Sequence, residues 1–213
     1  MTELVPRSWL GETAVCLGTG PSLTTDDVES CRGRGRVICV NDAYRMAPWA
    51  DALYAADAAW WKVHEDARSF KGACYTAEGL TNETRNVVIP GVTILKHGGW
   101  KGLSTKPDRI CYGVSGGNHS GYQALNLAVL YGAKRILLLG YDMQWADKRN
   151  HFFGQHPSPL QNSSHYDLFM RCYLSALEPL RALGVTVINC TRDTELTCFP
   201  QMSLDEALME RAA

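Results

Sequence analysis

Short apolar runs alternate with helix-like stretches along this chain, and that alternation restricts the folds it can adopt. The predicted strands are residues 13–17, 36–40, 52–55, 135–139 and 185–189. Parallel strands must be joined by long crossover connections, which are usually helices. The pattern therefore predicts an α/β fold in which helices cover a mostly parallel sheet.

Helical patterns are clearest in the second half of the chain. They predict helices at about residues 121–130 and 166–183. Pro179 lies inside the second helix and removes a backbone donor, so a kink or a break is expected there. Ser203 followed by Glu206 forms a capping-box pattern, which predicts that a terminal helix begins at this point.

The middle of the chain, about residues 70–112, carries the weakest signal. Short strands are predicted at residues 73–76 and 92–95, and residues 96–107 have the composition of a loop. No internal repeat, low-complexity run or linker marks a second domain. Residues 1–213 are therefore predicted to form a single domain, a size that can bury a hydrophobic core.

Composition excludes several classes of protein. Hydrophobic residues make up 46% of the chain and charged residues 20%, which indicates a globular protein rather than a disordered one. The 21 Lys and Arg residues balance 22 Asp and Glu residues, so nucleic acid is not expected to be the main partner. No run of about 18 apolar residues is present and the first residues do not resemble a signal peptide, so no membrane span is expected.

The eight cysteines are scattered and form no CxxC pair. Cys16, Cys39 and Cys190 lie inside apolar runs, where a free thiol behaves as a small buried hydrophobe. A structural zinc site needs clustered ligand pairs, which the sequence lacks. We therefore expect eight free thiols and a cytoplasmic protein.

The first predicted strand ends in residues 18–22, with the sequence GTGPS, and a short helix follows. Glycines allow a sharp turn, and free amides at a helix start attract phosphate, so this loop is predicted to hold a nucleotide phosphate. The dinucleotide fingerprint GxGxxG is incomplete, because Leu23 replaces its third glycine and Pro21 lacks an amide proton. Asp42 nevertheless lies where such folds keep their ribose-binding acid, so a nicotinamide or flavin cofactor remains an alternative. The other alternative is a tight turn without a ligand.

Polar side chains follow the ends of several predicted strands. They are Thr19, Asn41, Asp57, Ser115 and Asp142. In a doubly wound, Rossmann-like sheet the carboxyl ends of the strands border the ligand crevice. We therefore predict a Rossmann-like, mostly parallel, doubly wound sheet with these five residues near the ligand.

A loop with the sequence NHFFGQHP, residues 150–157, contains two histidines. An imidazole titrates near neutrality, so His151 or His156 could transfer protons. One alternative is a metal site that combines these histidines with Asp142 or Asp147, and another is a solvated loop without a role. Three further histidines are assigned no function: His64, His97 and His119.

These motifs together resemble those of known nucleotide-using enzymes over residues 13–189. The order GTGPSL, VND, SGG and YGAKRILLLGYDM is similar to that in the bacterial sialyltransferase-like family, whose members use CMP-sialic acid. It also resembles a related family that includes archaeal 6-hydroxymethylpterin diphosphokinases, and small bacteriophage-encoded proteins.

The resemblance implies roles for particular residues. The sialyltransferase loop GNGPS matches this chain except that Thr19 replaces its asparagine, and Asn41 matches a nucleotide-binding asparagine. Its T-S-G motif resembles residues 114–116, and its G-I-D motif resembles residues 140–142. The histidine motif HYIGH matches residues 151–156 with one residue inserted, and His156 is favoured as its base. The residues predicted to bind the nucleotide are Gly18, Thr19, Gly20, Pro21, Ser22, Asn41, Asp57, Ser115 and Gly116.

The leading prediction is a glycosyltransferase that uses a nucleotide-activated sugar and needs no further cofactor. His156 would act as general base, and His151 and Asp142 are the other catalytic candidates. One alternative is pyrophosphoryl transfer from ATP to a small hydroxymethyl compound, for which Asp57 and Asp142 would hold Mg²⁺. Another is a nucleotide-binding module without catalysis. The acceptor is not identifiable from the sequence, which is also compatible with a homo-oligomer.

Overall fold

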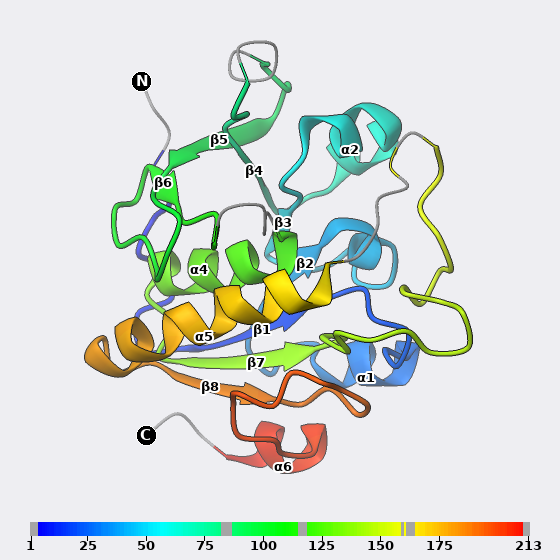
Figure 1. The fold of residues 1–213 in the computed structure, drawn as a ribbon, viewed down its shortest axis with the longest axis vertical. Coiled ribbons are helices and arrows are strands. Elements are labelled where there is room, and N and C mark those ends of the chain that lie inside the picture. Colours follow the sequence, from blue (N-terminus) through cyan, green and yellow to red (C-terminus); the bar gives the residue numbers. More distant parts are fainter. Residues whose placement is uncertain (1–3, 82–86, 115–118, 159, 161–164, 211–213) are drawn as a thin grey trace.

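An eight-stranded sheet runs through the computed structural model, which describes residues 4–81, 87–114, 119–158, 160 and 165–210. Its strand order is β6-β5-β4-β3-β2-β1-β7-β8, and every neighbouring pair is parallel (Figure 1). The strands are β1 (Thr13–Leu17), β2 (Arg36–Val40), β3 (Ala52–Tyr54), β4 (Ala73–Ala77), β5 (Val92–His97), β6 (Arg109–Ile110), β7 (Arg135–Leu139) and β8 (Thr186–Asn189). The predicted α/β class with a mostly parallel sheet is confirmed.

Helices cover both faces of this sheet. They are α1 (Thr25–Ser30), α2 (Ala58–Val63), α4 (Ser120–Tyr131), α5 (Tyr166–Ala182) and α6 (Leu204–Met209), with 3₁₀ turns η1 (Asn41–Arg45) and η2 (Glu65–Ser69). Side chains of β1 alternate between two buried clusters, because successive strand residues point to opposite faces. Ala14 and Cys16 pack with α4 and α5, and Val15 and Leu17 pack with α1, α2 and α6.

Most predicted elements are found within one or two residues of their expected bounds. The sequence reading missed β6, α2 and the two 3₁₀ turns, which are short and have weak patterns. The break expected at Pro179 is wrong, because α5 continues through this residue to Ala182. The missing donor lies near the helix end, and packing of residues such as Tyr173 and Leu180 holds the helix in place.

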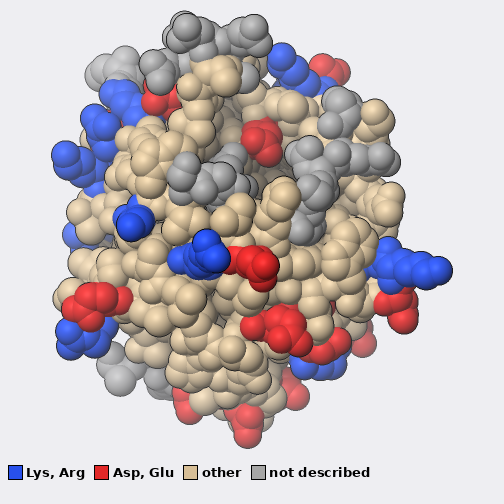
Figure 2. Space-filling model, viewed as in Figure 1, with Lys and Arg blue, Asp and Glu red and all other residues tan. Residues whose placement is uncertain are grey.

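The eight cysteines are all free, as predicted, and seven of them are buried. Burial raises the pKa of several thiols, for example that of Cys16 to about 12. None of the described helices is both long and apolar enough to cross a membrane. Charges of both signs are spread over the face shown in Figure 2, where blue side chains are most numerous toward its left edge.

The sheet reverses its strand order between β1 and β7, and this reversal positions the functional site. The chain adds strands on one side of β1 up to β6 and then returns to the other side of β1 to form β7. The connections that leave β1 and β7 at the carboxyl edge lead to helices on opposite faces of the sheet, and a crevice opens at this edge, the usual ligand site in such sheets. The long connection from β7 to α5 lies at this edge (Figure 1).

Candidate functional site

A cavity of about 200 Å³ lies at the carboxyl edge beside β1 and β7. Its floor comes from residues 18–20 after β1, 40–41 at the end of β2 and 140–143 after β7. The first residues of α4 and α5 form one wall, and His151 and His156 from the connection after β7 belong to the other. The cavity thus occupies the crevice that the strand order creates.

Four of the five polar residues that follow the predicted strands meet in this cavity. They are Thr19, Asn41, Asp57 and Asp142. The fifth, Ser115, lies outside the described residues, as does Gly116. The sequence therefore located the correct edge of the sheet, because the carboxyl ends of parallel strands lie together.

Two amides of the glycine loop are not free to bind a phosphate, contrary to the prediction. Gly20 donates its N–H to the carbonyl of Gly140 (2.8 Å), and Ser22 donates its N–H to Oδ2 of Asp142 (2.8 Å). Pro21 and Ser22 are also not among the described residues that line the cavity. The loop is braced against the loop after β7, and the predicted cradle of amides is wrong for these residues.

Close packing between the same two loops explains the glycines. A Cβ on Gly18 would lie 2.4 Å from the carbonyl oxygen of Gly140, and a Cβ on Gly20 would lie 1.8 Å from Oδ1 of Asp142. Any side chain at Gly20 must therefore displace Asp142. A larger residue at Gly20 would therefore disturb the fold as well as any ligand binding.

Asp142 is buried, and its side chain accepts the amide proton of Ser22. Burial raises the pKa of its carboxyl above the usual value. Asp57, at the N-cap of α2, is more exposed, but the surrounding cavity walls also raise its carboxyl pKa. These are the two acidic side chains among the described lining residues.

His151 is tied to the glycine loop. Its Nδ1 lies 2.9 Å from Oγ1 of Thr19, and the next residue, Phe152, donates its N–H to the carbonyl of Thr19 (2.9 Å). Burial, with a smaller effect of the neighbouring His156, lowers the pKa of His151 to about 4. The ring is therefore neutral at pH 7.

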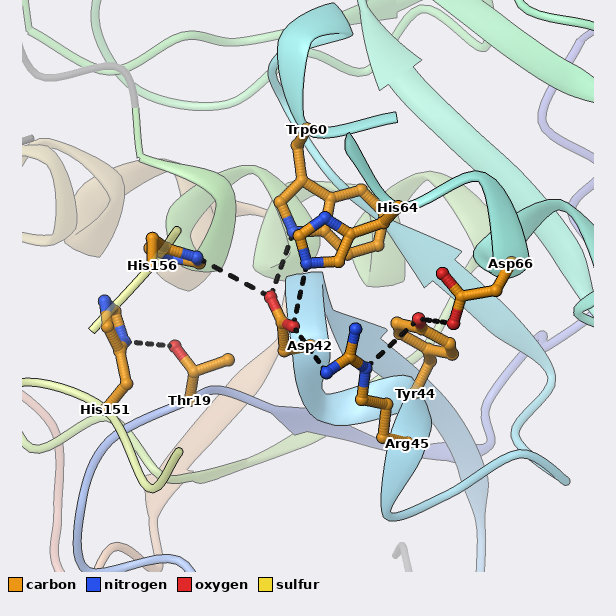
Figure 3. Close-up of polar contacts among 9 residues, drawn as sticks. All are labelled: Thr19, Asp42, Tyr44, Arg45, Trp60, His64, Asp66, His151 and His156. Atoms are coloured by element: carbon orange, nitrogen blue, oxygen red, sulfur yellow. Dashed lines mark hydrogen bonds and ion pairs between the residues drawn. The ribbon is translucent and has the colours of Figure 1, made fainter. Parts of the chain in front are cut away.

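His156 faces a buried carboxylate that comes from η1 (Figure 3). Its Nδ1 lies 3.7 Å from Oδ2 of Asp42. The same carboxylate has two further partners. Oδ1 lies 3.0 Å from Nε2 of His64, and Oδ2 accepts the Nε1–H of Trp60 at 3.0 Å. Burial lowers the pKa of His156, although Asp42 opposes this shift. Asp42 is thus engaged inside the protein, and its interpretation as a ribose-binding acid is wrong.

His119 was given no role from the sequence, yet it lines the cavity at the N-cap of α4. Its Nδ1 accepts the N–H of Tyr122 (3.3 Å), and its ring stacks on Phe169 of α5 at 4.2 Å between ring centres. Burial, with a contribution from His151, lowers its pKa to about 3. The sequence signal that could have indicated a role for His119 was its position just before a predicted helix.

Two residues of the floor have left-handed backbone conformations that side chains rarely adopt. They are Asn41, with φ of 48°, and Met143, with φ of 53°. Asparagine tolerates this region better than most residues, whereas methionine does not. Such strain persists where the surrounding structure enforces it, which is common at functional sites.

Two helix N-termini are the positive groups in the described wall of the cavity. The N-termini of α4, with 12 residues, and α5, with 17 residues, both reach its wall, so their positive dipole ends point toward it. No Lys or Arg belongs to the described lining residues. The described part of the chain also holds no group of three His, Cys, Asp or Glu side chains suited to a metal ion, so the proposed histidine–aspartate metal site lacks its ligands there.

Neither a protein-family model nor a curated protein matches this chain. A solved structure does match it: the sialyltransferase CstII from Campylobacter jejuni, in complex with a substrate analogue, cytidine-5′-monophosphate. The TM-score is 0.57 at 12% identity, and the match covers 90% of this chain and 85% of the other. The chain shares its fold with a sialyltransferase. The resemblance to diphosphokinases and bacteriophage proteins stays a prediction.

Proposed function

We propose that this protein is a nucleotide-binding transferase that moves a sugar from a CMP-type donor to an acceptor hydroxyl. One observation carries the proposal: the cavity at the strand-order reversal combines helix N-termini with neutral histidines, one of which faces a carboxylate. The shared fold supports it, because the matching sialyltransferase structure contains cytidine-5′-monophosphate.

The charge of the cavity favours a nucleotide with a single phosphate. The triphosphate of ATP needs Lys, Arg or bound cations to neutralise it, and the described lining contains neither Lys nor Arg. The undescribed residues 115–118 and 161–164, which adjoin lining residues in the sequence, also contain none. Two helix N-termini suffice for the smaller charge of a nucleoside monophosphate. The cavity therefore fits the donor of a sugar transferase better than the triphosphate of the ATP-dependent alternative.

The floor of the cavity supplies groups that suit a nucleotide. Asn41 offers both a donor and an acceptor, which can pair with a base or a ribose. Gly18, Thr19 and Gly20 line the same cavity, and we assign Ser115 and Gly116 to nucleotide binding on their resemblance to the T-S-G motif.

We assign the general base to His156 rather than His151. In the transfer, the acceptor oxygen attacks the anomeric carbon, and the bond from that carbon to the phosphate oxygen breaks with its electron pair on the nucleotide. The hydroxyl proton passes to the imidazole, which becomes charged. Asp42 lies 3.7 Å from His156 and would stabilise this imidazolium, whereas His151 faces the neutral hydroxyl of Thr19.

Calorimetry and a release assay test this proposal. We expect CMP to bind and ATP with Mg²⁺ to bind about tenfold more weakly or not at all, a difference of about 1.4 kcal/mol. With CMP-sialic acid as the donor, we expect release of CMP by the wild type above that of His156→Ala. Binding of ATP with Mg²⁺ in preference to CMP would favour the diphosphokinase alternative. Tight CMP binding without turnover of any CMP-sugar and acceptor would favour a module that only binds the nucleotide.

A further inference from the structure

Asp42 is a buried carboxylate shared by two histidines that come from different parts of the chain. Its side chain is 3% exposed. Oδ1 contacts Nε2 of His64 at 3.0 Å, and Oδ2 is 3.7 Å from Nδ1 of His156 (Figure 3). Trp60 donates its Nε1–H to Oδ2 at 3.0 Å. The two carboxylate oxygens therefore have distinct partners, which fixes the orientation of the group.

His64 is buried, and the packing of its ring fixes its position. Its side chain is 3% exposed, and its ring stacks on Trp60 with 4.4 Å between centres. Burial lowers its pKa, so the ring is neutral near pH 7. Its Nδ1 is buried and has no hydrogen-bond partner in the described structure. An unpaired N–H costs more than an unpaired acceptor there, so the proton lies on Nε2, which donates it to Asp42.

Arg45 is the only cation near Asp42 among the described residues, and it does not replace the hydrogen bond that His64 donates to the carboxylate. Arg45 is 3.7 Å from Oδ1, but its side chain is 54% exposed and its charge is screened by solvent. Its Nε donates instead to the hydroxyl of Tyr44 (3.2 Å), which donates to Asp66 (2.5 Å). Arg45 is therefore drawn toward the surface, and the buried donors to Asp42 are His64 and Trp60.

We propose that His64 is a positioning residue that acts on His156 through Asp42. By donating its Nε2–H to Oδ1, His64 prevents the carboxylate from rotating and keeps Oδ2 directed at Nδ1 of His156. Nδ1 of His156 is buried without a hydrogen-bond partner in the described structure, and its 3.7 Å separation from Oδ2 is longer than a hydrogen bond. A lone pair on Nδ1 would face the negative charge of Asp42, whereas an N–H dipole is attracted to it, so His156 carries its proton on Nδ1 and keeps the Nε2 lone pair available to accept a proton. The catalytic part of this inference rests on the proposed function, but the tautomer of His156 does not.

Nitrogen-15 NMR of the histidine side chains in the ligand-free protein tests the inference without a substrate. We expect the wild type to show a single neutral tautomer of His156, with the proton on Nδ1. His64→Phe keeps a ring against Trp60 but removes the donor, so we expect a mixture of the two tautomers. His64→Gln retains an amide donor and is expected to restore the wild-type shifts. A folded His64→Phe protein with unchanged His156 shifts would overturn the proposal.

A second variant keeps the test informative if His64→Phe does not fold. Asp42→Asn has nearly the same shape and removes the charge, and we expect it to abolish the preference for the Nδ1 tautomer. If His156 keeps that tautomer in Asp42→Asn, the relay through Asp42 is wrong. The shifts of His97, which packs against Tyr112 outside the cavity lining, serve as the internal control and should not change.

Kinetics then separate the failure of this inference from the failure of the proposed function. If no CMP-sugar is turned over but the tautomer of His156 follows His64, the relay stands and the transferase proposal fails. If CMP is released, we expect His64→Phe to lower kcat with little change in KM, and His64→Gln to restore it. A change confined to KM would overturn a positioning role.

Discussion

The hydroxyl of Thr19 and Nδ1 of His151 lie 2.9 Å apart, although 132 positions separate them in the sequence. This contact joins the glycine loop after β1 to the histidine loop after β7. The backbone repeats the connection, since Phe152 donates its N–H to the carbonyl of Thr19. The two loops that the sequence singled out separately therefore behave as one structural unit.

Thr19→Val should loosen this unit. Valine has nearly the shape of threonine but cannot bond His151, and a typical hydrogen bond contributes about 1 kcal/mol. We expect the amide of Phe152 to exchange with solvent about five times faster, measured by hydrogen–deuterium exchange. Thr19→Ser keeps the hydroxyl and serves as the matched control. Equal exchange in the valine and serine variants would show that the side-chain bond does not hold the loop.

Gly20→Ala should destabilise the fold more than an alanine at an open glycine. The added Cβ would lie 1.8 Å from Oδ1 of Asp142 and force it away from the amide of Ser22. Gly33→Ala is the control, because its site is open and only its positive φ is strained, at a cost of about 1 kcal/mol. We expect a loss at Gly20 of about 2 kcal/mol or more, measured by urea unfolding. Equal losses at the two sites would contradict the packing argument.

Folding stability should fall in mild acid because of two buried histidines. Burial lowers the pKa of His119 to about 3 and of His151 to about 4, from 6.5 in the unfolded chain. Below pH 6.5 the unfolded chain binds protons that the folded protein does not, so stability present above pH 6.5 is lost as the pH falls toward 4. Each histidine adds up to about 1.4 kcal/mol per pH unit.

Urea unfolding between pH 7 and pH 4 measures this slope. His119→Gln and His151→Asn should each flatten it, because neither replacement titrates in this range. Gln155→Asn, at an exposed residue of the same loop as His151, changes no titrating group and is the control. A wild-type stability independent of pH over this range would contradict the burial argument.

His156→Ala should lower turnover by about 10²–10⁴-fold while sparing nucleotide affinity, the usual contribution of a general base. The wild type should lose activity as the pH falls through the pKa of His156, because a protonated imidazole accepts no proton. Burial places that pKa below its usual value, so activity should persist into mild acid. His151→Ala should have the smaller effect in pH–rate profiles. The reverse order would move the base to His151.

The eight thiols should react slowly in the native protein and completely after denaturation without reductant. Burial raises the pKa of Cys31 to about 12 and that of Cys74 to about 11. Burial also raises the pKa of the partly exposed Cys198 to about 11. A thiol-reactive chromogenic reagent, followed by mass spectrometry, counts the labelled residues. We expect Cys198 to be labelled first, since it is the least buried. A native disulfide would refute this reading.

The sequence by itself determined most of the helices and strands and the edge of the sheet at which the cavity lies. Strand and helix patterns depend on neighbours within a few residues, so β1, β2, α4 and β7 were predictable. The capping box at Ser203 and Glu206 was predictable for the same reason, and the structure contains it. Parallel pairing then gathers strand ends at one edge, which accounts for Thr19, Asn41, Asp57 and Asp142.

Only the tertiary structure decided what those residues touch. The sequence suggested that the amides near Gly20 were free, but the loop after β7 occupies them. It gave no reason to join Asp42 with His64 or His156, because η1, α2 and the loop after β7 meet only when the sheet is assembled. Local patterns fix local conformation, whereas contacts between distant residues depend on sheet register and packing, which no short stretch of sequence encodes.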